Sequence, residues 1–242
     1  MKKNLYAGLL AAGLSTALAG CGSLNITKLE TFLGSSSGGP LSVETIVAGL
    51  KEALTVGTRN TVTQTSKSGG YLNNARIRIP LPRELQTVGK TMRAVGLSSL
   101  VEDFEKKMNV AAEQAATQAA PVFVGAIRQM TFADAKAILA GKETAATDYF
   151  REKTSGRLRD LYKPIIATYT DQSGAARAYK SLLDRYAQIP LVPKPQTPSL
   201  DDFVTEKAID GLFTILADEE IRIRKDPAAR TTQLLRTVFA RY

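Results

Sequence analysis

The spacing of apolar residues constrains the fold of this chain more than any other feature of its sequence. From Ser42 onward, apolar residues recur every three or four positions, which gives each segment one apolar face along a helix. Only residues 76–79 alternate with the two-residue period of a strand, and Pro80 and Pro82 follow them directly, so we expect an extended connector there. We therefore predict an all-α, single-domain, bundle-like fold of about eight helices over residues 41–242.

Capping residues, glycines and prolines indicate where these helices begin and end. Ser99, Thr131 and Ser199 each have an acidic residue three positions later, which is the arrangement of a capping box. Gly96 is expected to end a helix, and Pro121 is expected to break or kink one. The segment after Ser199 is the most apolar and is expected to lie at the centre of the core. The predicted helices begin at Ser42, Pro82, Ser99, Thr131, residue 144, residue 174, Ser199 and Asp226.

The first 21 residues have the pattern of an exported, lipid-modified protein. Lys2 and Lys3 precede an apolar run at residues 5–18, and Leu18-Ala19-Gly20-Cys21 closes it. A bilayer-spanning helix needs roughly 20 apolar residues, so a cleaved leader fits this run better than a retained anchor. The closing tetrapeptide resembles the bacterial lipobox, which implies that residues 1–20 are removed and that Cys21 carries acyl groups such as palmitate. The alternative is an ordinary secretory leader in which the cysteine has no role.

Residues 21–40 are expected to form a flexible tether between the acylated cysteine and the domain. Residues 35–40 read Ser-Ser-Ser-Gly-Gly-Pro, a composition that buries little surface. Gly22 and Ser23 stand where an aspartate would resemble the inner-membrane retention signal. We therefore predict a lipid-anchored location at the outer membrane, facing the periplasm.

The residue types that are missing narrow the possible chemistry. The chain has no histidine and no tryptophan, and Cys21 is its single cysteine. Without histidine it lacks an imidazole base for serine activation and an imidazole ligand for zinc or copper. We expect no enzymatic activity, no cofactor and no metal, although a carboxylate pair, a Ser/Lys pair or a hard-metal carboxylate site stays possible.

The charge of the chain indicates what kind of partner it binds. Without the leader, 30 basic residues stand against 23 acidic ones, a net charge of +7. An excess of this size favours anionic partners, such as an acidic envelope protein, an acidic glycan or an anionic lipid. Nucleic acid is not expected, because the leader predicts export from the cytoplasm.

Two segments with polar side chains are candidates for binding. Arg59 and Asn60 follow Gly57, and a glycine inside a helix costs about 1 kcal/mol relative to alanine. Something that binds there is therefore expected to approach the backbone at Gly57. The alternative is close helix packing at Gly57, with Arg59 solvated. The amides of Asn73 and Asn74 suit a polar ligand, and they equally suit a turn.

Charged residues of the later segments are further candidates. Arg151 and Lys153, with Arg157 and Arg159, give the helix of residues 144–170 a basic side that suits phosphates or acidic glycans, unless it is only solvated. Glu219 and Glu220 lie at angles close to the apolar side of the central helix. A buried carboxylate needs a partner, and Arg230 is the cation expected to pair with them and a further candidate for binding.

Several stretches of this sequence resemble the DUF4197 family of bacterial envelope proteins, a domain of unknown function. The resemblance implies a lipoprotein-type export signal and a helical domain, and it implies no catalytic residue or ligand. The stretches are Gly49-Leu50-Lys51-Glu52-Ala53-Leu54-Thr55-Val56-Gly57-Thr58-Arg59-Asn60, Tyr71-Leu72-Asn73-Asn74 with Ile79-Pro80-Leu81-Pro82, Ala146-Thr147-Asp148-Tyr149-Phe150-Arg151-Glu152-Lys153-Thr154, and Asp226-Pro227-Ala228-Ala229-Arg230-Thr231-Thr232.

Three hypotheses of function follow from these observations. The first is a binding or scaffolding module for an envelope partner, supported by the tether, the positive charge and the missing catalytic residue types. The second is a carrier of lipid or another apolar ligand, since helices rich in alanine, leucine and phenylalanine can enclose an apolar cavity. The third is an enzyme that uses Glu219 and Glu220 as a carboxylate pair for metal binding or acid/base chemistry.

Overall fold

The computed structural model describes residues 42–172, 174–191 and 199–239, which belong to one compact unit, Leu41–Tyr242. The predicted leader, Cys21 and the tether lie outside the described residues. Within the described ranges the chain forms nine α-helices, two 3-10 helices and no strand, which confirms the all-α, single-domain prediction. The α-helices are α2 (Val43–Ser66), α3 (Gln86–Ala94), α4 (Ser98–Ala116), α5 (Ala119–Gln129), α6 (Phe132–Ala140), α7 (Ala145–Gln172), α8 (Ala175–Ala187), α9 (Leu200–Lys225) and α10 (Gln233–Phe239).

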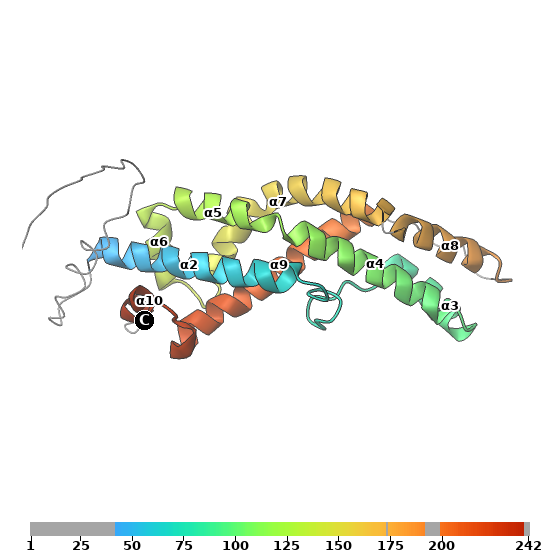
Figure 1. Ribbon diagram of the computed structural model, residues 1–242, viewed down its shortest axis with the longest axis horizontal. Helices are drawn as coiled ribbons and strands as arrows, with labels where there is room; N and C mark the ends of the chain where they lie inside the picture. The colour runs from blue at the N-terminus through green and yellow to red at the C-terminus, as the bar shows by residue number, and fades with distance from the viewer. Residues whose placement is uncertain (1–41, 173, 192–198, 240–242) are drawn as a thin grey trace, which may run out of the picture. The chain divides into compact units, whose positions relative to one another are not determined.

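Helix α9 lies at the centre of the core, as its apolar sequence predicts. It packs against α2, α4 and α7, and twelve of its residues are buried. Helices α3 and α8 lie beside α4 at one end of the unit, on the right of Figure 1. Helices α6 and α10 pack against α2 at the opposite end. No helix in the described ranges is long and apolar enough to cross a bilayer.

Two of the three predicted capping boxes place a side chain at a helix start. Thr131 and Asp134 form both halves of the box at α6: the Asp134 amide donates to Thr131 Oγ1 at 3.1 Å, and the Thr131 amide donates to Asp134 Oδ2 at 2.9 Å. At α9, the Ser199 hydroxyl accepts a hydrogen bond from the amide of Asp202. These polar contacts satisfy N–H groups that have no partner within their own helix.

The third capping box, predicted at Ser99, is wrong. Helix α4 begins one residue earlier, and its cap position, Leu97, makes no side-chain hydrogen bond. Gly96 explains the difference: it has a φ of +82°, and the following Leu97 amide donates to the Met92 carbonyl at 2.9 Å. This left-handed turn caps the C-terminus of α3 and leads directly into α4, which places the start of α4 at Ser98, before the predicted cap residue.

The loop between α2 and α3 is held by polar side chains of α4. The Asn109 side chain donates to the Ile79 carbonyl at 2.9 Å and accepts from the Ile79 amide at 2.8 Å. One turn further along α4, Glu113 Oε1 accepts from the amides of Tyr71 and Leu72 at 3.0 and 3.1 Å.

The extended connector predicted at residues 76–79 is wrong for its first half, because residues 75–77 form a turn in which the amides of Ile77 and Arg78 donate to the Asn74 carbonyl at 3.1 and 2.8 Å. The backbone groups of Ile79, which follow this turn, are satisfied by Asn109 and need no strand partner.

The C-terminal helix begins later than predicted. Asp226 and Pro227 open a 3-10 helix, Pro227–Ala229, and α10 starts only at Gln233. Asp226 still acts as a cap, because its carboxylate accepts from the Ala228 amide at 2.9 Å.

Candidate functional site

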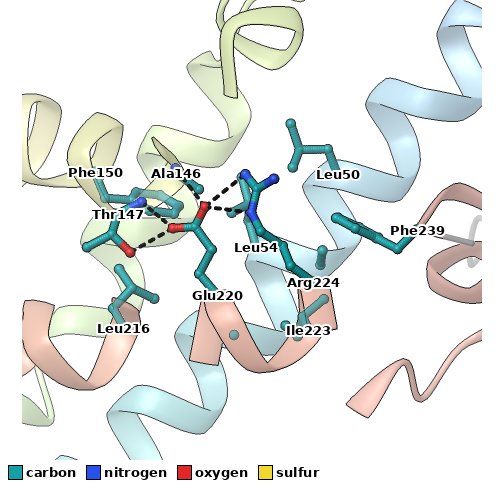
Figure 2. A pocket seen from close by; sticks show the side chains of 12 residues that line it. Leu50, Leu54, Ala146, Thr147, Phe150, Leu216, Glu220, Ile223, Arg224 and Phe239 are labelled. Atoms are coloured by element: carbon teal, nitrogen blue, oxygen red, sulfur yellow. Dashed lines mark hydrogen bonds and ion pairs between the residues drawn. The ribbon is translucent and has the colours of Figure 1, made fainter. Parts of the chain in front are cut away.

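The most connected polar group in the described core is the carboxylate of Glu220. It accepts hydrogen bonds from the backbone amides of Ala146 and Thr147 at 3.0 and 2.8 Å, and from the Thr147 hydroxyl at 2.9 Å. Figure 2 shows these groups converging on Glu220 from the first turn of α7. A carboxylate is stabilised there by the unpaired N–H groups and by the positive end of the helix dipole, so Glu220 caps α7 from a different helix.

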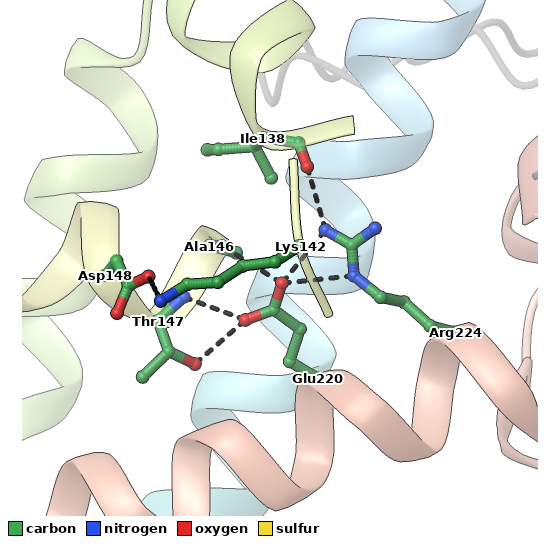
Figure 3. Close-up of polar contacts among 7 residues, drawn as sticks. All are labelled: Ile138, Lys142, Ala146, Thr147, Asp148, Glu220 and Arg224. Atoms are coloured by element: carbon green, nitrogen blue, oxygen red, sulfur yellow. Dashed lines mark hydrogen bonds and ion pairs between the residues drawn. The ribbon is translucent and has the colours of Figure 1, made fainter. Parts of the chain in front are cut away.

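Arg224 completes this cluster one turn along α9. Its Nη2 donates to Glu220 Oε1 at 2.9 Å and also to the Ile138 carbonyl in the last turn of α6 at 2.9 Å. Figure 3 shows that Glu220 and Arg224 together connect the end of α6, the start of α7 and the side of α9. Both oxygens of Glu220 accept hydrogen bonds from α7, and one also accepts from Arg224. The cluster therefore fixes the position of the end of α6 relative to the start of α7.

Glu219 makes a separate and more exposed set of contacts. Asn60 donates to Glu219 Oε2 at 3.1 Å, and Arg222 donates to the same oxygen at 2.5 Å. The two glutamates thus do not share a partner. Glu219 links α2 to α9, whereas Glu220 caps α7.

Arg230 does not pair with these carboxylates as predicted from the sequence. It donates through Nε to the Ile223 carbonyl at 3.2 Å and through Nη2 to the Arg224 carbonyl at 2.8 Å. Both acceptors lie in the last turn of α9, whose final carbonyls have no partner within the helix. The burial of Glu219 and Glu220 agrees with the prediction, and their ion pairs are made by Arg222 and Arg224 of the same helix.

A small cavity adjoins the Glu220 cluster. Its volume is about 20 Å³, and its lining includes Leu50, Leu54, Phe150 and Phe239 (Figure 2). A space of this size holds about one water molecule. It is not a ligand site for a lipid or a sugar.

The other candidates in α2 and the following loop have mostly structural surroundings. Arg59 is exposed, and a Cβ added at Gly57 would meet Ile223 at 3.6 Å, so α9 packs on this glycine with ordinary contact distances. Asn74 Oδ1 accepts from the Arg76 amide at 3.1 Å, which is an Asx-turn. Asn73 is exposed in the same turn. Asn60 is bound to Glu219, as described above. The structure therefore favours helix packing and turn formation over ligand binding at Arg59, Asn60, Asn73 and Asn74.

The basic side of α7 is divided between ion pairs and an open groove. Arg151 pairs with Asp210 at 3.1 Å and lies over the ring of Phe213, with its Cζ 4.5 Å from the ring centroid. Arg159 pairs with Glu206 at 2.7 Å. Both ion pairs join α7 to α9 at exposed positions, where such a pair contributes little to stability.

Lys153 and Arg157 instead face a groove between α5 and α7. The groove has a volume of about 490 Å³ and is lined by Gln118, Pro121, Val122, Gly125, Ala126, Gln129, Lys153, Thr154, Arg157 and Leu161. Lys153 also forms an ion pair with Glu152 at 2.8 Å, and this hydrogen bond raises the pKa of Lys153 above its ordinary value. Arg157 forms no ion pair with any other described residue. We call this feature the α5–α7 groove.

The sequence match agrees with the helical structure. A family model described as "Protein of unknown function (DUF4197)" matches residues 40–240, which is most of the chain. The chain belongs to the DUF4197 family. No curated protein and no solved structure matches it. DUF4197 membership therefore establishes the family and assigns no activity.

Two partners of the buried glutamates in this DUF4197 domain, Arg224 and Arg222, were not identified from the sequence. Arg224 lies four positions after Glu220 and Arg222 lies three positions after Glu219, so the spacing of salt bridges along one helix could have found them. Arg157 lies one turn after Lys153, but only the position of α5 shows that both side chains line one groove. In the described ranges, no three acidic or cysteine side chains are grouped closely enough to hold a metal ion.

Proposed function

We propose that this chain is a lipid-anchored protein of the outer membrane whose helical domain binds an anionic envelope partner in the periplasm. The α5–α7 groove is the observation that carries the proposal. It combines two cations, Lys153 and Arg157, with the side-chain amides of Gln118 and Gln129 and an apolar floor. Cations fix anionic groups, amides bind hydroxyl or carbonyl groups, and the volume lies within the usual range for ligand sites.

A glycine in the groove supports the same conclusion. Gly125 lies inside α5, where glycine costs about 1 kcal/mol relative to alanine. A Cβ added there would have no neighbour within 4 Å, so packing within the domain does not require glycine. Gly156 of α7 has equally open surroundings, so open surroundings alone do not indicate binding; Gly125 supports the proposal because it lies in the groove lining, where a partner would approach the α5 backbone closely.

The two other functions have less support. A lipid carrier needs an enclosed apolar volume, and the cavity beside Glu220 holds about one water molecule. A carboxylate enzyme needs a free acid or base, and both oxygens of Glu220 accept bonds from α7 and Arg224. Both observations favour a binding module.

Crosslinking in the native host tests the groove directly. The partner crosslinked to the wild-type protein is recovered from solubilised envelopes and compared with that of Gly125→Leu, which fills the groove. Gly156→Leu is the matched control, because Gly156 is also a helix glycine with no neighbour within 4 Å of an added Cβ and does not line the groove. We expect Gly125→Leu to lose the partner and Gly156→Leu to keep it; equal recovery would exclude the groove.

Reversing the charges of the groove distinguishes recognition of an anionic partner from recognition of an apolar one. The double variant Lys153→Glu/Arg157→Glu is expected to lose the partner, because it places two carboxylates in the groove. Lys180→Glu/Arg185→Glu on α8 changes the net charge equally at exposed positions outside the groove and serves as control. Retention of the partner by the groove variant would show that its charge is not recognised.

The membrane anchor needs its own test. Labelled palmitate is expected to enter the wild-type chain and not Cys21→Ser, and the substituted chain is expected to leave the outer-membrane fraction. Label in Cys21→Ser, or unchanged fractionation, would contradict acylation at Cys21.

A further inference from the structure

Helix α6 is apolar on both its buried and its exposed sides. Seven of its nine residues are apolar, and the two others are Asp134, which caps the helix, and Lys136. Ala135, Ile138 and Leu139 are buried in the domain, whereas Phe132 is 51% exposed. A helix that is apolar on all sides is normally covered on all sides. The domain covers only one side of α6.

The exposed side of α6 continues onto the first turns of α2. A groove of about 350 Å³ runs between the two helices and is lined by apolar side chains and one charged one. Val43, at its α2 edge, is 46% exposed, so two of the five large apolar side chains exposed in the described ranges lie here. We call this surface the α2–α6 face; its main residues are Val43, Ile46, Val47, Phe132, Lys136 and Ala140.

The position of this face in the chain indicates what covers it. Val43 is the first residue of α2, and only 21 positions separate Cys21 from Ser42. A chain of that length reaches at most about 70–75 Å, so an acyl group on Cys21 keeps the start of α2 close to the bilayer. Tethering makes contact between this face and lipid an intramolecular event, for which even weak binding suffices.

We propose that the α2–α6 face rests on the bilayer surface, with Val43 and Phe132 at the boundary between headgroups and acyl chains. This inference rests on the proposed lipid anchor. Apolar side chains at that depth lose contact with water, while the Lys136 ammonium, the one charge in the lining, can reach the headgroup phosphates. The contact fixes which side of the domain faces the membrane.

Tryptophan fluorescence can test this contact because the chain contains no tryptophan. Phe132→Trp and Val43→Trp place a single emitter on the face. Val95→Trp is the control, because Val95 is 52% exposed and follows α3 at the other end of the unit. Each acylated full chain is reconstituted in vesicles of phosphatidylethanolamine and phosphatidylglycerol, with and without brominated acyl chains, and vesicle attachment is measured by flotation.

The expected result is that brominated lipid quenches Phe132→Trp and Val43→Trp at least about twofold more than Val95→Trp. Chains that float while all three emitters are quenched equally would overturn the docking and leave the anchor intact. Chains that do not float would overturn both. A third outcome is that the emission of Phe132→Trp and Val43→Trp is blue-shifted without vesicles and stays unquenched in brominated ones. That result would show that protein covers the face, and it also overturns the proposal.

Discussion

Removal of the Glu220 side chain should destabilise the domain far more than removal of Glu219. In Glu220→Ala, the buried amides of Ala146 and Thr147 lose their acceptor, and Arg224 loses its carboxylate. An unsatisfied buried N–H costs about 1–3 kcal/mol, and breaking a buried ion pair costs about 3–5 kcal/mol. Since these terms overlap, we expect a total loss of about 3–5 kcal/mol in the free energy of unfolding.

Glu219→Ala is the internal comparison at the adjacent position. Its partner Arg222 has a side chain that is 49% exposed, so water replaces the lost bond, and we expect a loss of about 1 kcal/mol. The two variants should differ by about 2–4 kcal/mol, which corresponds to roughly 5–15 °C in Tm for a domain of this size.

Urea unfolding followed by circular dichroism at 222 nm measures both variants. Glu220→Gln adds a control for side-chain volume, because it keeps one acceptor oxygen and removes the charge; it should fall between the other two. If Glu220→Ala and Glu219→Ala lie within about 1 kcal/mol of each other, the assignment of Glu220 as the cap of α7 is incorrect.

Three smaller changes test other contacts. Gly49→Ala should cost about 1–3 kcal/mol in unfolding experiments, because its Cβ would lie 2.4 Å from Val238 Cγ2 and displace α10; unchanged stability would contradict this packing. Gly57→Ala should stabilise by up to about 1 kcal/mol, since its nearest neighbour would be 3.6 Å away, and a loss would mean that α9 lies closer. Hydrogen bonds from Thr131 lower the pKa of Asp134 below 3.8, so this cap stabilises α6 above that pH and is lost as the pH falls through the folded pKa. NMR titration should show the Asp134 pKa rising toward 3.8 in Thr131→Val, and an unchanged pKa would rule out the cap.

The helices could be predicted because their causes are local. An apolar face with a period of 3.6 residues identifies α7 and α9 without any knowledge of their neighbours. The capping box at Thr131 involves only residues three positions apart, so it too was visible in the sequence. The start of α4 was misplaced because the turn at Gly96, which ends α3, leads into α4 before Ser99, and the position of this start depends on how the two helices are connected.

The partners of the buried polar groups could not be predicted in the same way. Glu220 caps a helix by accepting from Ala146, 74 residues earlier in the chain, and Asn109 binds a loop residue 30 positions away. Such pairs depend on how helices cross, which a single sequence does not encode locally. The α5–α7 groove is a similar case, since its cations lie on one helix and its amides on another.

Helix α4 fixes two points of the loop between α2 and α3 and leaves the stretch between them to form its own turn. Asn109 and Glu113 are one turn apart, about 6 Å along the helix axis, and they fix the backbone at Ile79 and at Tyr71. Ile77 is also buried between these points, whereas the exposed chain around Asn73 is not bound by α4. Family members that differ in length between Tyr71 and Ile79 should therefore gain or lose residues near Asn73, and keep the two segments that α4 binds.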